Sequence, residues 1–101
     1  MASSKEYADF ILDQCSGLSA RAMMGEYVLY YNGKVIGGVY DNRLLVKPTR
    51  SAKVLMPGAK YQLPYEGAKE MLFVEAVEDR AFLEKLFASM YDELPEPKKR
   101  R

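Results

Sequence analysis

Two short turn signals, Asn32-Gly33 and Asp41-Asn42, constrain the fold of this chain more than any other part of its sequence. Asn-Gly between two apolar runs is the strongest short-range signal for a β-hairpin, because both residues readily adopt a positive φ. Pro48 cannot donate a ladder hydrogen bond, so the last strand ends before it. The sequence therefore predicts an antiparallel meander whose strands, rich in valine, leucine and tyrosine, cover 26–31, 34–40 and 43–47.

The same turns predict the register of the meander, because a two-residue loop places its flanking residues opposite each other. Tyr31 then faces Lys34, and Tyr40 faces Arg43. Side chains alternate between the two faces of a strand, so the register also sorts them into two sets. The face that we expect to pack against helices collects Val28, Tyr30, Val35, Gly37, Val39, Leu44 and Val46. The outer face collects Tyr27, Leu29, Tyr31, Lys34, Ile36, Gly38, Tyr40, Arg43, Leu45 and Lys47.

Helical patterns flank the meander. Apolar residues at helical spacing predict a helix from about Ser4 to Ser16, and Ser3 and Glu6 have the spacing of a capping box. Thr49 is expected to cap a short helix, and Asp79 is expected to cap a longer one whose apolar residues recur up to Met90. Short strands are expected at 61–63 and 71–75.

These elements indicate an α+β fold of two layers, an antiparallel sheet with helices on one face. The expected order of elements is α-β-β-β-α-β-β-α. The domain is expected to span 1–94, because residues 95–101 hold little that could be buried and end in a basic run. We expect 95–101 to be a disordered basic tail.

Composition narrows the chemistry open to the chain. Its 101 residues include no histidine and one cysteine, Cys15, which we interpret as a small core residue. Histidine-dependent catalytic arrangements and zinc sites built from cysteine and histidine are thereby excluded. No two carboxylates have a diagnostic spacing, so a small enzyme of unknown reaction is the least favoured function. We expect a non-enzymatic protein that needs no cofactor.

The ends and the charge of the chain bear on its location and partners. Residues 1–6 lack the apolar stretch of a signal peptide, and no apolar run approaches the roughly 20 residues that span a bilayer. We expect a cytoplasmic protein with no membrane partner. The net charge is only +1, but 21–69 holds eight basic against three acidic side chains. Charge is therefore segregated along the chain.

The expected outer face offers two candidate binding surfaces. Apolar and aromatic residues on one exposed face are typical of protein interfaces, so a protein partner or a homodimer is the leading interpretation. A loop such as 58–69 could instead cover this face within the monomer. The candidate interface residues are Tyr27, Leu29, Tyr31, Ile36, Tyr40 and Leu45. Basic residues interleaved with tyrosines suit nucleic acid, which is the alternative partner, and the candidate contacts are Lys34, Arg43, Lys47, Arg50, Lys53 and Lys60.

Four further runs stand out: 21–34 with its Met-Met-Gly-Glu-Tyr element, 41–48 with Leu-Leu-Val-Lys-Pro, 65–71 and 77–83. Together they resemble the N-terminal domain of the TfoX/Sxy competence regulators. Met24 and Glu26 stand where that family usually has phenylalanine and glycine. The resemblance implies a two-layer domain with the order helix, three strands, helix, two strands, helix. It also implies a regulatory role in transcription, exerted by contact with a transcription regulator.

Overall fold

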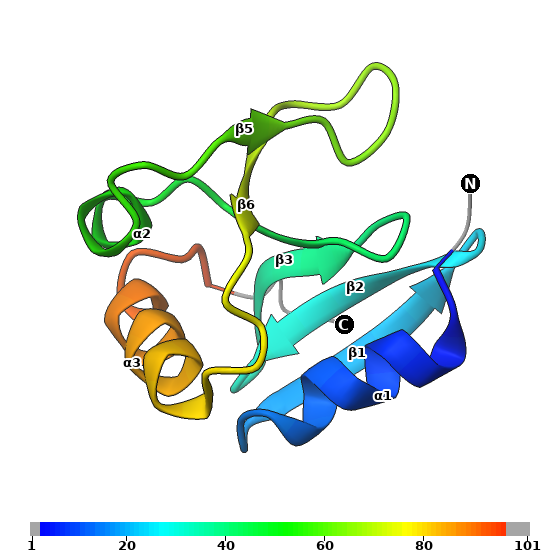
Figure 1. Cartoon of the computed structure of the whole chain (residues 1–101), viewed down its shortest axis with the longest axis horizontal. Coiled ribbons are helices and arrows are strands. Elements are labelled where there is room, and N and C mark those ends of the chain that lie inside the picture. Colours follow the sequence, from blue (N-terminus) through cyan, green and yellow to red (C-terminus); the bar gives the residue numbers. More distant parts are fainter. Residues whose placement is uncertain (1–2, 97–101) are drawn as a thin grey trace.

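The computed structural model describes residues 3–96, which form one six-stranded sheet and three helices (Figure 1). Every pair of neighbouring strands is antiparallel, and the strand order is β1-β2-β3-β4-β6-β5. The elements along the chain are α1 (Lys5–Asp13), β1 (Leu18–Met23), β2 (Glu26–Tyr31), β3 (Lys34–Val39), β4 (Leu44–Val46), α2 (Arg50–Leu55), β5 (Tyr61–Gln62), β6 (Met71–Val74) and α3 (Arg80–Tyr91).

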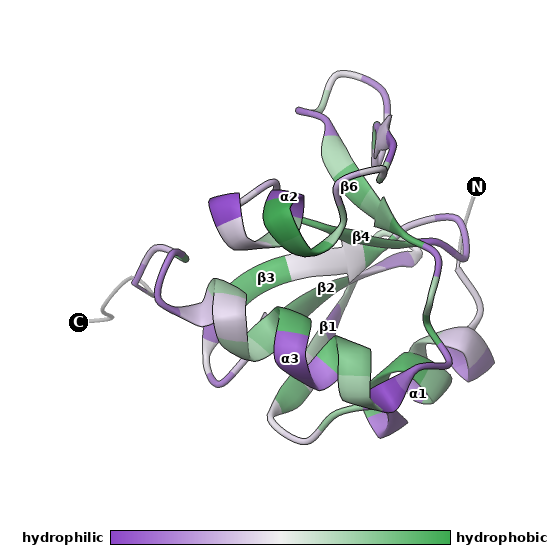
Figure 2. Cartoon of the chain, turned by 60° about the vertical axis from the view of Figure 1, so that its left-hand side comes forward, coloured by the Kyte–Doolittle hydropathy of each residue, from purple (hydrophilic) through white to green (hydrophobic). Residues whose placement is uncertain are grey.

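The hydrophobic core lies between one face of this sheet and the helices. Leu29, Ile36 and Val39 contribute from the sheet, while Ile11 of α1 and Phe87 of α3 meet them, and all five are fully buried. Figure 2 shows apolar colour on the central strands and on the sides of the helices that face them. The predicted α+β class with two layers is therefore confirmed.

The structure adds a strand that the sequence did not predict. β1 joins β2 through the turn Met24-Gly25, in which Met24 has φ 54° and Gly25 has φ 87°. Methionine is not a residue that favours a positive φ, and the strand itself is rich in alanine and serine rather than β-branched residues. Neither the turn nor the strand therefore carries a recognisable sequence signal.

The predicted hairpin turns are confirmed, but a β-bulge between them changes which faces are buried. Tyr31 pairs with Lys34 and Tyr30 with Val35, as expected, whereas Leu29 pairs with Gly37 instead of Ile36. Ile36 is therefore an extra residue in β3, and the alternation of side chains shifts by one at this point.

The prediction was consequently right for one half of the meander and wrong for the other. Val39, Leu44 and Val46 join the core, as expected. In β2 and the start of β3 the faces are exchanged, because the residues assigned to the outer face pack toward the helices. Those residues are Tyr27, Leu29, Tyr31, Lys34 and Ile36.

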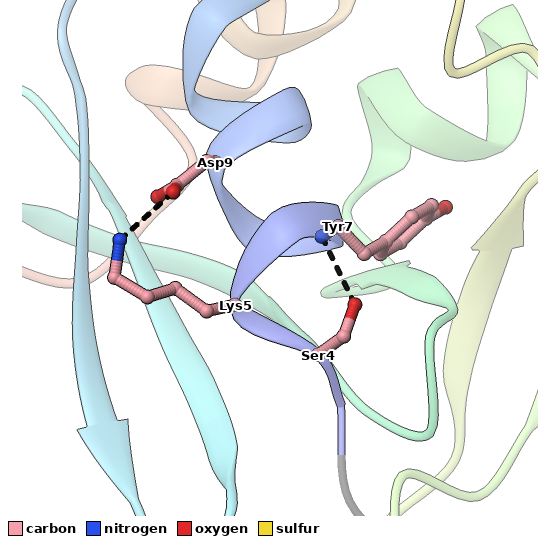
Figure 3. A network of polar contacts seen from close by, with 4 residues as sticks. All are labelled: Ser4, Lys5, Tyr7 and Asp9. Atoms are coloured by element: carbon pink, nitrogen blue, oxygen red, sulfur yellow. Dashed lines mark hydrogen bonds and ion pairs between the residues drawn. The ribbon is translucent and has the colours of Figure 1, made fainter.

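Helix capping follows the predicted chemistry with one correction. Thr49 caps α2 and Asp79 caps α3, each by accepting a hydrogen bond from a backbone N–H of the first turn. For α1 the cap is Ser4 rather than Ser3, since Ser4 Oγ accepts from the Tyr7 N–H at 3.1 Å (Figure 3). Lys5 and Asp9 form an exposed ion pair one turn apart.

Within residues 3–96, no helix combines the length and the apolarity needed to cross a membrane. In the same part of the chain, no cluster of three or more cysteine and acidic side chains is arranged to hold a metal ion. The predicted basic tail lies outside the described residues from position 97 onward.

Replacing Gly37 by alanine should test the bulge. An added Cβ would lie 2.8 Å from Val46 Cα and closer still to the Leu45 carbonyl oxygen, both parts of the β4 backbone. We expect Gly37→Ala to lower the free energy of unfolding by more than about 2 kcal/mol in urea titrations, because the strands must move apart. Gly58→Ala is the matched control, since nothing lies within 4 Å of its Cβ, and it should be neutral or slightly stabilising.

The interpretation of Cys15 as a core residue is confirmed by its burial, and this predicts its reactivity. Burial raises the pKa of the Cys15 thiol, and the negative charge of Glu84 raises it further. Thiolate is the reactive form, so we expect slow labelling by an aromatic disulfide reagent at pH 7 to 8, and fast labelling in denaturant. Absorbance of the released thiol measures the rate. Equally fast labelling of the native protein would contradict this assignment.

Candidate functional site

The outer face of the sheet is the side against which no helix of residues 3–96 packs. Cross-strand pairing identifies its residues, because directly paired side chains lie on the same face. One such row crosses the sheet from β2 through β3 and β4 to β6 and consists of Val28, Gly38, Leu45 and Phe73. Val35 and Tyr30 form a second pair of the same face.

This face carries a groove of about 610 Å³, a size typical of ligand and peptide sites. Its walls come from the β1–β2 hairpin, from β3 and from the loop that precedes β6. The lining is mainly apolar and aromatic, with one carboxylate. The lining residues are Met23, Met24, Glu26, Tyr27, Val28, Val35, Tyr40 and Tyr65.

The Tyr40 ring can lie across the groove because Gly38, beneath it, has no side chain. A Cβ on Gly38 would collide with the Tyr40 ring, so glycine is required for the ring to lie where it does. Tyr65 packs on the other side of Tyr40, with ring centroids 6.0 Å apart. Burial raises the pKa of Tyr40, and the neighbouring Tyr65 and Glu26 raise it further. The phenol is therefore neutral at physiological pH.

Glu26 ties three segments together at the end of the groove. Its Oε1 accepts hydrogen bonds from Ser3 Oγ at 2.7 Å and from the Asp41 N–H at 3.0 Å. Ser3 Oγ in turn accepts from the Asn42 N–H at 3.0 Å. These bonds fix the positions of three segments relative to one another: the residue before α1, the start of β2 and the β3–β4 turn. Rigidity at this end lowers the entropic cost of binding.

Met24 is the most exposed large apolar residue of the groove. The residue is 98% exposed, at the tip of the β1–β2 hairpin, and its backbone is left-handed. A left-handed conformation costs an L-residue other than glycine about 1–2 kcal/mol. Backbone strain of this kind clusters at functional sites, which makes the hairpin tip a candidate contact.

The structure corrects most of the predicted interface. Leu29 and Ile36 are fully buried, and Tyr27 and Tyr31 pack against the core on the helix side. Leu45 does lie on the outer face, but it is fully covered. Among the described residues, the predicted interface residues that line the outer groove are Tyr40 and Tyr27, the second of which also packs against the core. The bulge at Ile36 explains these errors, since it exchanges the faces of β2.

The predicted nucleic-acid contacts are also separated by the structure. Lys34 is only 5% exposed, and its Nζ donates to the Tyr91 carbonyl at 3.2 Å, lies 4.1 Å from the centre of the Tyr91 ring and 3.5 Å from Glu96 Oε2. It therefore holds the end of α3 against the sheet. A phosphate could not reach it without breaking these contacts, so Lys34 is withdrawn as a candidate contact.

Arg43 also serves the fold. Its guanidinium donates to the Tyr40 carbonyl at 3.0 Å, to Gln62 Oε1 at 2.6 Å and to the Leu63 carbonyl at 3.2 Å. These bonds fasten the β3–β4 turn to the segment that leads to Tyr65. The remaining predicted basic residues are more accessible: Lys47 is half-buried, and Arg50, Lys53 and Lys60 are exposed.

Sequence reasoning missed six residues as parts of the groove: Met23, Met24, Glu26, Val28, Val35 and Tyr65. Val28 and Val35 were assigned to the core because the bulge was not foreseen. For Met23 and Met24 the sequence held no recognisable signal, because methionine does not favour the positive φ that the turn requires at position 24.

Substitution of Lys34 should separate a structural role from a binding role. Lys34→Ala removes the donor to Tyr91 and leaves a void, so we expect the free energy of unfolding to fall by about 1–3 kcal/mol. Lys53→Ala, at an exposed position of α2, should change it by less than about 0.5 kcal/mol. Thermal and urea unfolding measure both. Equal stabilities of the two variants would contradict the tie to α3.

Comparison with known proteins finds one informative relative. No family model matches the chain, and no solved structure matches it. The sequence is 36% identical over 105 residues to an uncharacterized 12.7 kDa protein in the trpE 5' region of Spirochaeta aurantia. The match covers 100% of this chain and 91% of that protein. The likeness therefore extends over the whole domain described above.

Proposed function

The chain belongs to the same family as the 12.7 kDa protein of Spirochaeta aurantia, and we propose from its own geometry that it is a non-enzymatic binding module. Its outer sheet face receives an apolar segment of a partner protein. The observation that carries this proposal is the groove between the β1–β2 hairpin and Tyr65, with Met24 fully exposed at its rim.

The choice of residue at the hairpin tip supports a role in binding. The β2–β3 turn has Asn32 at φ 48° followed by Gly33, the residues that such a turn favours. The β1–β2 turn has the same form but places Met24 where asparagine would be more stable. Methionine is flexible and polarisable, and it adapts to varied apolar partners. Its side chain, rather than its fit to the turn, therefore accounts for its presence.

We place this binding in transcriptional regulation in the cytoplasm. The support is the resemblance of 21–34 and 41–48 to the TfoX/Sxy N-terminal domain, whose members work with a transcription activator. The first of these segments builds the β1–β2 hairpin tip and β2, which supply five of the eight residues that line the groove. The resemblance and the groove thus share this part of the chain.

Direct nucleic-acid binding is the second proposal and has less support. Lys34 and Arg43 are engaged within the fold, which leaves Lys47, Arg50, Lys53 and Lys60 as possible phosphate contacts. Four contacts would give weak affinity that falls steeply as salt rises. A partner bound in the apolar groove would instead be retained in high salt, because burial of apolar surface is not screened.

Met24→Asn should uncouple stability from binding. Asparagine accepts the left-handed conformation better, so we expect the free energy of unfolding to rise by about 0.5–1 kcal/mol. Partner binding should fall in the same variant, because the exposed apolar contact is lost. Urea unfolding measures the first effect. Photo-crosslinking in the producing cell, with a photoreactive phenylalanine analogue at position 24, identifies the partner. Titration of that purified partner against the unmodified protein and against Met24→Asn then measures the loss of binding.

The matched control places the same analogue at Lys53 on α2, away from the groove. A protein crosslinked equally from both positions would be a non-specific neighbour. The proposal is wrong if a partner specific to position 24 binds Met24→Asn with unchanged affinity. It is also wrong if no protein is crosslinked more strongly from position 24 than from position 53.

A further inference from the structure

β1 is an edge strand with one side of its backbone open. Among residues 3–96 it pairs with β2 alone, and Figure 1 shows no strand on its other side. An edge strand presents unpaired N–H and C=O groups that can pair with another chain. Most of β1 is exposed, including Ser19, Arg21, Ala22 and Met23.

The pairing with β2 shows which backbone groups point outward. The Asn32 N–H donates to the Gly17 carbonyl at 2.9 Å, so Gly17 belongs to a hydrogen-bonded pair. Hydrogen-bonded and non-bonded pairs alternate along antiparallel strands, so Ser19, Arg21 and Met23 also direct their N–H and C=O groups toward β2. The N–H and C=O groups of the alternate residues Leu18, Ala20 and Ala22 point to the open edge.

The two edges of the sheet differ in how they are protected. Proteins protect edge strands by making them very short, by adding a bulge, by placing proline or charged residues in them, or by covering them with a helix or loop. β5, at the opposite edge, has two residues. β1 has six residues, a continuous register with β2 and no proline. Arg21 is its one charged residue, and although α1 lies next to β1, four of the six residues are exposed. β1 therefore has the features of a strand that pairs, while β5 has those of a strand that does not.

We propose that β1 pairs antiparallel with β1 of a second copy of this chain, with Ala20 opposite the partner's Ala20 on the twofold axis. This register places Leu18 opposite the partner's Ala22. All three residues whose backbone groups point to the open edge therefore take part in each strand. An isologous contact of this kind closes on itself and joins the two sheets into one.

Side chains favour this register over its neighbours. On the outer face it sets Ser19 opposite the partner's Arg21, which is compatible. Shifting by one pair toward the hairpin would set Arg21 directly opposite the partner's Arg21, and like charges directly opposite are destabilising. Shifting the other way sets Ser19 opposite its own counterpart and loses Ala22 from the pairing. The strand is therefore self-complementary, which favours a second copy over an unrelated chain.

Charge substitutions at Ser19 test both the dimer and its register. Sedimentation velocity of the full chain over a concentration series gives the dimer dissociation constant. Ser19→Glu adds an opposite charge against each Arg21 and should lower that constant about two- to thirty-fold, while Ser19→Lys should raise it by a similar factor. The double variant Ser19→Lys with Arg21→Glu should restore it. Ser89→Glu and Ser89→Lys, at an exposed position of α3, are the matched controls and should have no effect.

Amide hydrogen exchange provides a second measurement on the unmodified protein. The Ala20 amide should exchange quickly in dilute solution and slowly when the dimer forms, whereas the Ser19 amide should be protected in both. A monomer at all concentrations up to the millimolar range would overturn the proposal. A dimer that both Ser19 variants weaken would also overturn it, since that result places Ser19 opposite itself. Met24→Asn should leave the dimer unchanged, so this test is independent of the groove.

Discussion

The close approach of β4 to Gly37 is the constraint on which the arrangement of this domain depends. The Leu45 carbonyl and Val46 Cα occupy the space that any side chain at position 37 would need. β3 can therefore follow β4 closely only where it has no Cβ, and the bulge at Ile36 brings Gly37 to that point. The bulge in turn determines that β2 turns Leu29 into the core and Val28 toward the outer face. The outer groove exists because of this single extra residue.

Local chemistry allowed much of the fold to be predicted. The turn at Asn32-Gly33, the caps at Thr49 and Asp79 and the helical spacing around Phe87 each depend on residues within one or two turns of chain. The faces of β2 depend instead on how β3 meets β4, which no local pattern records. Because side chains alternate with a period of two, one inserted residue was enough to exchange the predicted core and the predicted surface.

The candidate site was harder to predict than the fold, because the type of a residue does not determine whether its side chain is exposed or what it contacts. Lys34 and Arg43 have the residue types of phosphate contacts, yet their partners are carbonyls and side chains of distant segments. Lys34 also shows that a lysine can be nearly buried when its ammonium group meets a carbonyl and an aromatic ring. Conversely, Met24 has the residue type of a core position and lies almost wholly in solvent. Their roles follow from tertiary contacts alone.

The succession of two-residue turns from β1 to β4 has a consequence for how the chain folds. Each of these strands pairs with its sequence neighbour, so the meander needs only local loop closures, which are fast. β6 must then pair with β4 across a long stretch of chain. α3 follows β6 and must pack on the apolar face of β2 and β3. During synthesis the meander therefore emerges with that apolar face uncovered by α3. Docking of α3 completes the core cluster that contains Leu29 and Ile36, and apolar surface left exposed before such a step makes incompletely folded chains prone to aggregate.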